Sequence, residues 1–286
     1  MVKALACELP GKFGLPLSRF SRADLRRHVL AAGLVAQISG VTIWRWLRQD
    51  AIRPWSHRSW LFPRDPLFAE KAGRVLDLYH RRWQGKALGP GDFVISADEK
   101  TQIQIRARRH VITAPRAHRS MRIESDYTRH GTCAYVAAWD VHRAKLFGRV
   151  VKQISIQSFD ALVADVMRRA PYRTARRVFW IVDNGTIHRG QRAVARLRAR
   201  WPNLVLVHLP IHASWLNQVE IYFSIVQRKA LTPDDFSTQA DVTARLLGFQ
   251  RHYQRIARPF EWRFTRADLV KLLKRCSPPA RLQNAA

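Results

Sequence analysis

An uninterrupted apolar stretch that ends in an acid is the feature that most constrains the fold of this chain. Residues 178–182 are all apolar, and Asp183, Asn184 and Gly185 follow directly. Such a run predicts a central strand covered on both faces, and the Asp-Asn-Gly sequence predicts a turn after it. Because open α/β sheets keep their sites at strand ends, this stretch places a carboxylate where chemistry is common.

The other expected elements follow the order of an α/β domain with a mixed sheet, in which strands come first and then alternate with helices. Periodicity predicts further strands at 93–97, 132–141, 145–152 and 203–209, and helices at 158–169, 188–201, 217–230, 238–256 and 266–275.

Two further acids are candidates for the site of Asp183. Asp98 follows the first of these strands, and Glu220 lies in the first turn of the helix after the fifth. If the first and fourth strands are neighbours, the three carboxylates converge, and without a paired arginine they repel one another unless hard cations lie between them. Magnesium is the expected cation, and a pair of such ions is an effective device for breaking a phosphodiester.

Each acid also has a purely structural interpretation, which the residues alone leave open. Residues 217–220 have a capping-box pattern, residues 183–185 form a good turn, and residues 98–100 suit a solvated strand end. Glu99 is expected on the opposite side of the strand from Asp98. His188 is expected to bond to backbone at a helix start, with contact to substrate or leaving group as the alternative.

The charge balance indicates a polyanionic partner. The chain has 50 Lys and Arg against 21 Asp and Glu, for a formal net charge of +29. Because the basic residues are spread over the whole chain, nucleic acid is favoured over a membrane surface. Between 106 and 129 the arginines, among them Arg106, Arg108 and Arg109, are expected to follow a phosphate backbone rather than only to solvate the surface.

The remaining composition argues for a reducing compartment. The three cysteines are far apart, so neither a disulfide framework nor a thiolate zinc site is expected. No apolar run approaches the length of a membrane span, and the N-terminus lacks a signal-peptide core. We therefore expect a cytoplasmic protein.

The N-terminal residues predict a small helical DNA-binding region. A capping-box pattern at Ser21 begins one helix, and Ser39 caps a second one over 40–50 that carries Thr42, Arg45 and Arg48 on its outer side. This arrangement is typical of a helix-turn-helix, with an ordinary helical hairpin as the alternative. The expected domains are a helix-turn-helix region over 1–54, a linker over 55–90 with one helix at 67–83, and a catalytic domain over 91–286.

Three segments resemble the catalytic blocks of DDE transposases, in the bacterial insertion-sequence branch of the mariner superfamily. They are residues 94–101 with Asp98, residues 180–188 with Asp183, and residues 209–220 with Glu220. The resemblance implies a ribonuclease H-like catalytic domain in which Asp98, Asp183 and Glu220 bind two Mg²⁺ ions, with Mn²⁺ as a substitute.

The same resemblance implies a reaction and its partners. Water nicks double-stranded DNA at the transposon ends, and the freed 3′-hydroxyl attacks target DNA. A homodimer is expected in the DNA complex, in a bacterial cytoplasm and close to the nucleoid. Relatives carry two helix-turn-helix units where only one fits here, so the N-terminal region is expected to be incomplete. A non-catalytic DNA-binding remnant and a nuclease that cuts without joining strands are the alternatives.

Overall fold

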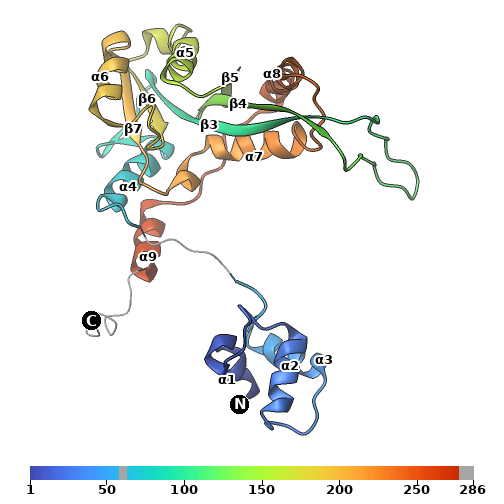
Figure 1. The fold of residues 1–286 in the computed structure, drawn as a ribbon. Coiled ribbons are helices and arrows are strands. Elements are labelled where there is room, and N and C mark those ends of the chain that lie inside the picture. The colour runs from blue at the N-terminus through green and yellow to red at the C-terminus, as the bar shows by residue number, and fades with distance from the viewer. Residues whose placement is uncertain (58–62, 277–286) are drawn as a thin grey trace. The chain divides into compact units, whose positions relative to one another are not determined.

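The computed structural model describes residues 1–57 and 63–276, and the chain forms two compact units, Met1–Leu61 and Phe62–Ala286 (Figure 1). Residues 58–62 of the expected linker and residues 277–286 of the expected catalytic domain lie outside this description. No helix among the described residues has both the length and the apolar character needed to cross a bilayer.

The first unit is all helical. It contains α1 (Val2–Ala6), the 3-10 helix η1 (Pro10–Phe13), α2 (Arg22–Ala31) and α3 (Gly40–Gln49). Ser21 and Asp24 form the expected capping box of α2, and Ser39 Oγ accepts the N–H of Thr42 at 3.0 Å at the start of α3. Leu25 of α2 and Ile43 of α3 pack in one small apolar core. Both expected helices are therefore present.

The second unit is built on a five-stranded mixed sheet in the order β5-β4-β3-β6-β7. Its strands are β3 (Asp92–Ala107), β4 (Thr128–Asp140), β5 (Lys145–Val151), β6 (Arg177–Val182) and β7 (Leu204–His208). The first three pair antiparallel, whereas β3, β6 and β7 run parallel. The expected first and fourth strands are β3 and β6, and they are neighbours.

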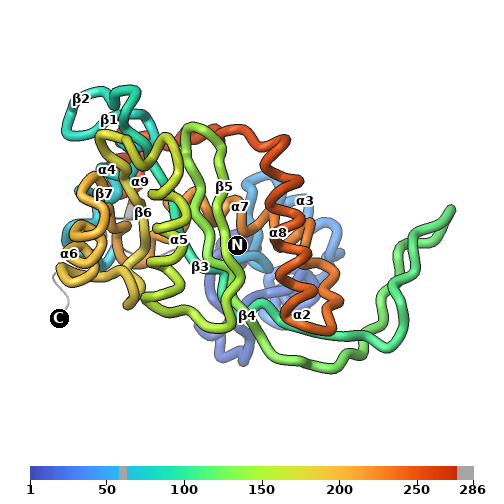
Figure 2. Tube along the Cα trace, turned by 90° about the horizontal axis from the view of Figure 1, so that it is seen from above, coloured from blue at the N-terminus to red at the C-terminus, as the bar shows by residue number. Residues whose placement is uncertain are grey.

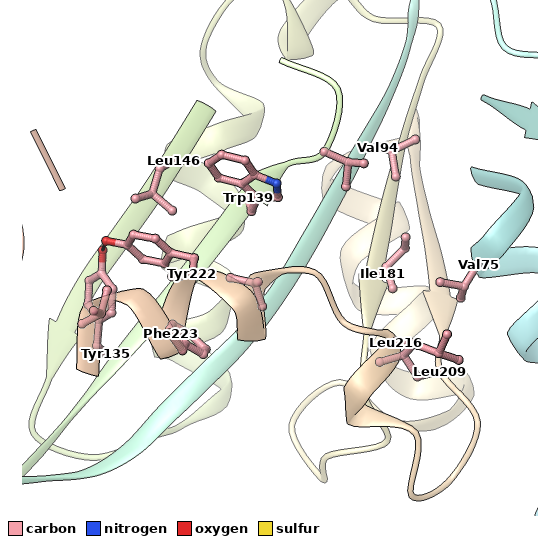
Figure 3. Close-up of a cluster of buried hydrophobic side chains, with 14 of the residues drawn as sticks. Val75, Val94, Tyr135, Trp139, Leu146, Ile181, Leu209, Leu216, Tyr222 and Phe223 are labelled. Carbon is pink, nitrogen blue, oxygen red and sulfur yellow. Dashed lines mark hydrogen bonds between the residues drawn. The ribbon is translucent and has the colours of Figure 1, made fainter. Parts of the chain in front are cut away.

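Helices cover both faces of this sheet, as expected for the fold class. One face packs on α5 (Ile156–Met167) and α6 (Gly190–Arg200). The other packs on α4 (Phe68–Tyr79), α7 (Val219–Lys229), α8 (Gln239–Ile256) and α9 (Arg266–Cys276). Figure 3 shows Tyr222 and Phe223 of α7 against Tyr135 and Trp139 of β4. The core thus holds α7, which carries Glu220, against the sheet.

The strand β3 is much longer than the expected 93–97. It continues past Asp98 because β4 pairs with it throughout, for example at Asp98–Ala137, with register shifts between Lys100 and Ile103 and between Gln104 and Arg106. Asp98 therefore lies within a strand and not at its end. Residues 108–127 form an arm that extends beyond the sheet (Figures 1 and 2).

The helix expected within the linker belongs to the second unit. Ala72, Val75 and Leu76 of α4 are fully buried in the core of the sheet's α7 face, so this segment is not a free connector. The helix ends at Tyr79 and not at Trp83, because Arg81 has a positive φ of 57° and the chain turns into a two-stranded hairpin, β1 (Arg82–Trp83) and β2 (Lys86–Ala87).

Candidate active site

Three acids from three elements interact electrostatically beside the carboxyl-terminal end of β6. Asp98 lies within β3, Asp183 directly follows β6, and Glu220 lies in the first turn of α7. The parallel pairing of β3 with β6, with Ser96 opposite Ile181, places the first two side by side. The charges of Asp183 and Glu220 both contribute to a raised pKa of Asp98, and the charge of Asp183 contributes to that of Glu220. The three carboxylates that were expected to converge thus lie close enough to affect one another's pKa.

Asp98 is the most buried of the three acids, with 8% of its surface exposed. Burial is the main reason that its pKa rises to about 7, and the neighbouring carboxylates of Glu99, Asp183 and Glu220 add to the rise. Its Oδ1 accepts the N–H of Glu99 at 2.8 Å, and its Oδ2 accepts Nδ2 of Asn217 at 2.9 Å. Each oxygen of this acid is thus oriented by one donor.

Asp183 is held by the turn that follows it. Its Oδ1 accepts the N–H of Gly185 at 2.7 Å and also a hydrogen bond from Nε2 of His188. The bond from His188 is the main reason that the pKa of Asp183 is lowered. The side chain of Asp183 is 42% exposed, whereas that of His188 is completely buried. The turn therefore presents the remaining oxygen of Asp183 to solvent.

His188 supports Asp183 from within the fold rather than from the solvent side. Its ring packs on Phe159 at 5.1 Å between centroids, and its Nδ1 lies 3.8 Å from Oε1 of Glu99. The ring therefore bonds to a side chain, which differs from the backbone bond expected from the sequence. The backbone carbonyl of His188 instead accepts Nε2 of His208 at 2.8 Å.

Close packing explains why glycine follows Asp183 and Asn184. A Cβ atom at Gly185 would lie 2.9 Å from Oδ1 of Asp183 and 3.1 Å from Nε2 of His188. Asn184 donates from Nδ2 to the carbonyl of Leu209 at 2.6 Å, which connects the turn to the end of β7. The Asp-Asn-Gly sequence thus forms the turn and also holds the Asp183 carboxylate in place.

Glu220 does not form the capping box that its sequence allows. The first N–H groups of α7 are satisfied by other elements: Gln218 N by the hydroxyl of Tyr79 at 3.3 Å, and Val219 N by Oγ of Ser96 at 2.9 Å. The N–H of Glu220 itself bonds to the carbonyl of Asn217. The Glu220 carboxylate accepts no hydrogen bond from the described residues. Burial raises its pKa, while the charge of Lys100 acts in the opposite direction.

The carboxylate oxygens of the three acids are chemically suitable ligands for a hard divalent cation. Oδ2 of Asp183 and both carboxylate oxygens of Glu220 accept no hydrogen bond within the described part of the chain, and no arginine neutralises the three acids there. Oxygen ligands and uncompensated negative charge are what Mg²⁺ and Mn²⁺ prefer. In residues 1–57 and 63–276 no three His, Cys, Asp or Glu side chains already surround one point at metal-binding distance.

The comparison with protein families decides the assignment. A family model described as "DDE superfamily endonuclease" matches residues 94–243, which is more than half of the chain and contains all three acids. The chain belongs to the DDE superfamily of endonucleases. A search of curated proteins gave no match.

Solved structures show the same fold at low sequence identity. The crystal structure of the Mos1 mariner paired end complex with Mn matches with a TM-score of 0.50 and 13% identity, over 92% of this chain and 79% of that chain. The Mos1 catalytic domain matches with a TM-score of 0.47 and 14% identity, over 78% of this chain and 96% of that chain. The resemblance drawn from the three motifs is confirmed at the level of the DDE superfamily and of the fold.

The arm of this DDE endonuclease corrects one expected DNA contact. Only 7% of the Arg108 side chain is exposed: its Nε donates to the carbonyl of Glu124 at 2.8 Å, and its guanidinium pairs with Asp234. Arg106 also pairs with Asp234, at 3.3 Å, and lies over the ring of Tyr127. Arg108 is thus occupied in holding the base of the arm, and the acid that pairs with it lies 126 residues away in sequence.

Other basic side chains of the endonuclease remain exposed. Arg109 at the start of the arm is exposed, as are Arg45 and Arg48 on α3 of the first unit. Thr42 is half-buried, and its hydroxyl lies 2.8 Å from that of Ser39. The guanidinium of Arg48 lies over the Trp44 ring at 5.1 Å. Of the expected DNA contacts, the structure leaves Arg45, Arg48 and Arg109 most accessible.

A polar cavity of about 370 Å³ adjoins β3 beyond Asp98. Its lining is mostly polar and includes Lys100, Gln102, Gln104, Arg106, Gln227 and Asp234. Lys100 also interacts electrostatically with Glu220, so the cavity begins close to the acids. The sequence did not predict this cavity, because its lining combines residues of β3 with residues such as Gln227 of α7, which lie far away in sequence.

Proposed function

We propose that this endonuclease is a transposase that cleaves DNA at transposon ends and transfers the freed strands into target DNA. The observation that carries the proposal is the convergence of Asp98, Asp183 and Glu220 on a ribonuclease H-like sheet, with no arginine pairing with them among the described residues. In a very basic chain, a cluster of unpaired acids is not a DNA-binding surface. It has a function only if cations offset its charge.

The three acids would hold two Mg²⁺ ions, with Mn²⁺ as a substitute. Bound there, the ions lower the pKa of a water molecule and stabilise the oxygen that leaves phosphorus. The chain's own contribution is orientation: Glu99 N–H and Asn217 fix Asp98, and Gly185 N–H and His188 fix Asp183. The Mos1 complex of the same fold contains Mn, which supports this metal class.

The chemistry consists of two displacements at phosphorus. In the first, a water oxygen bonds to phosphorus and the P–O3′ bond breaks, which leaves a 3′-hydroxyl and a 5′-phosphate. In the second, the 3′-hydroxyl attacks a target phosphodiester and the target's own 3′-oxygen leaves. One P–O bond forms and one breaks in each step, so no covalent enzyme intermediate is needed.

DNA would bind to basic surfaces of both units. The charge of +29 and the exposed Arg45, Arg48 and Arg109 suit a phosphate backbone. Residues 1–54 would recognise transposon ends as a helix-turn-helix, and the polar cavity with Lys100 and Gln227 would contact a strand near the acids. We further propose a homodimer in the DNA complex, since the Mos1 structure of the same fold is a paired end complex.

The test is strand cleavage of a labelled duplex that carries the element's own ends, in Mg²⁺ and in EDTA. Asp183→Asn should abolish cleavage and leave DNA affinity intact or slightly raised, because it removes a metal ligand and a negative charge beside a polyanion. Asp165→Asn makes the same chemical change at an exposed ion pair with Arg149 and should cleave like wild type.

Three outcomes would contradict all or part of the proposal. Cleavage by Asp183→Asn at the wild-type rate would show that the site lies elsewhere. Salt-sensitive DNA binding without any cleavage by the wild-type protein would identify a DNA-binding remnant of an insertion element instead. Cleavage without joining to target DNA would limit the function to that of a nuclease.

A further inference from the structure

A buried asparagine connects the first acid to the helix that carries the third. Asn217 is 1% exposed and lies between the 3-10 helix η3 (Ser214–Leu216) and α7. Its Nδ2 donates to the carbonyl of Ala97 at 3.0 Å and to Oδ2 of Asp98 at 2.9 Å. Its Oδ1 accepts a hydrogen bond from the hydroxyl of Ser96. The side chain thus uses both of its donors and its acceptor on β3.

These contacts leave the amide only one orientation. A flipped amide would direct its oxygen at the carbonyl of Ala97 and at the carboxylate of Asp98, which are both acceptors. The hydroxyl of Ser96, which donates to Asn217, accepts the N–H of Val219 at 2.9 Å. Ser96, Asp98 and the start of α7 therefore form one network, with Asn217 at its centre.

The network decides how Asp98 and Glu220 are placed relative to each other. Glu220 comes three residues after Asn217, and its N–H bonds to the Asn217 carbonyl at 3.1 Å. The same residue therefore orients the Asp98 carboxylate through its side chain and positions the turn of Glu220 through its backbone. Substitution of a group that orients a metal ligand commonly reduces metal affinity or activity about 10–100-fold.

We propose that Asn217 is a positioning residue that sets the affinity of the three acids for divalent cations by holding the Asp98 carboxylate against the start of α7. The inference rests on the proposed function, because it assumes that Asp98 and Glu220 bind metal.

Another asparagine offers a comparison for a purely structural role. Nδ2 of Asn203 likewise donates two hydrogen bonds, but both go to backbone carbonyls, those of Tyr172 and Ala175, at 3.0 Å each. None of its hydrogen bonds reaches one of the three acids. Asn203→Ala therefore removes a similar pair of bonds without releasing a carboxylate, and it serves as the matched control for lost stability.

The experiment is a calorimetric titration of the full chain with Mn²⁺ alone, in the absence of DNA, for wild type, Asn217→Ala and Asn203→Ala. We expect Asn217→Ala to bind Mn²⁺ about 10–100-fold more weakly, and Asn203→Ala to bind it like wild type. DNA affinity in EDTA should be equal for all three. Cleavage by Asn217→Ala should recover at high Mn²⁺ concentration, which a merely unstable protein would not do.

Each outcome bears on a distinct claim. Wild-type Mn²⁺ affinity in folded Asn217→Ala, with normal binding by the wild-type protein, overturns the inference alone. A wild-type protein that neither binds Mn²⁺ nor cleaves DNA overturns the proposed function and this inference with it. If Asn217→Ala does not fold, Asn217→Ser tests the same point, because one short hydroxyl cannot bond to both Ala97 and Asp98.

Discussion

The turn after β6 gives a sharp test, because a single methyl group at Gly185 should separate activity from stability. An alanine Cβ there would lie 2.9 Å from Oδ1 of Asp183 and 3.1 Å from Nε2 of His188. Heavy-atom contacts are most favourable at about 3.5–4.0 Å, so one of these groups must move. The His188 ring is buried against Phe159, whereas Asp183 is 42% exposed. Asp183 is therefore expected to rotate away.

The cost to folding should be small. Rotation of Asp183 breaks its hydrogen bonds with His188 and with Gly185 N–H, and each contributes about 1 kcal/mol net, less than a buried bond to a charged group because Asp183 is 42% exposed. The φ angle of Gly185 is not in the left-handed region, so alanine adds no backbone strain there. It also reduces the entropy of the unfolded chain, which offsets about 0.4–1 kcal/mol. The free energy of unfolding should thus fall by roughly 1 kcal/mol.

The cost to catalysis should be far larger, because a misplacement of about 1 Å at a reacting group can reduce the rate about 100-fold. Urea denaturation and DNA strand cleavage in Mg²⁺ measure the two effects on the same protein. Gly248→Ala is the matched control: it lies within α8, and its added Cβ would meet only Nη2 of Arg251, at 3.9 Å. It should stabilise the helix and leave cleavage unchanged.

Near-normal cleavage by Gly185→Ala would refute the argument that this turn positions Asp183 for the reaction. A loss of several kcal/mol in stability, with cleavage falling only in proportion to the folded fraction, would refute it equally, since His188 and not Asp183 would then have moved.

Two further predictions concern stability and DNA binding. Burial alone would raise the pKa of Asp92, but hydrogen bonds from Arg176 and Arg177 hold it well below its usual range. Asp92→Asn should therefore lower the free energy of unfolding by about 2–3 kcal/mol at neutral pH. This loss is smaller than that for breaking a fully buried ion pair, because both arginines are partly exposed. A lowered pKa stabilises the fold above the ordinary carboxyl pKa, so the difference between wild type and variant should vanish in acid, as measured by denaturation at several pH values. Arg45→Ala and Arg48→Ala should each weaken DNA binding in a filter or anisotropy assay, and each should reduce the salt dependence of the affinity by the equivalent of about one phosphate contact. An unchanged salt dependence would show that these side chains of α3 do not contact the DNA backbone.

Local patterns in the sequence predicted where most strands of the sheet lie and pointed to the three acids that the fold brings near one another. The apolar run before Asp183 requires burial on both faces, and in the structure β6 is central, between β3 and β7. The strand order of the structure, with β3 beside β6, then brings Asp98 beside Asp183, as the sequence predicted for neighbouring strands. The capping motifs at Ser21 and Ser39 fixed two helix starts, because their partners lie only three residues away.

The partners of buried polar groups could not be predicted, because they come from distant parts of the chain. Asn217 had the pattern of a helix cap, but its amide bonds to residues about 120 positions earlier. Arg108 had the pattern of a phosphate ligand, but Asp234 lies on the loop after α7. In each case the local pattern was compatible with two roles, and only tertiary packing selects between them.

Buried acids of one type show how packing separates structural from functional roles. Asp92 and Asp98 lie on the same strand, yet arginines lower the pKa of the first, and burial with neighbouring acids raises that of the second. A raised pKa alone does not mark a site, however, because burial also raises the pKa of Asp140. Asp140 accepts the hydroxyl of Tyr172 at 2.7 Å and two backbone N–H groups, and no other acid contributes to its shift. The distinguishing property of Asp98 is that its destabilising neighbours are themselves acids. Mutual repulsion of this kind agrees with the proposed site, in which a bound cation would offset the charge of the three acids.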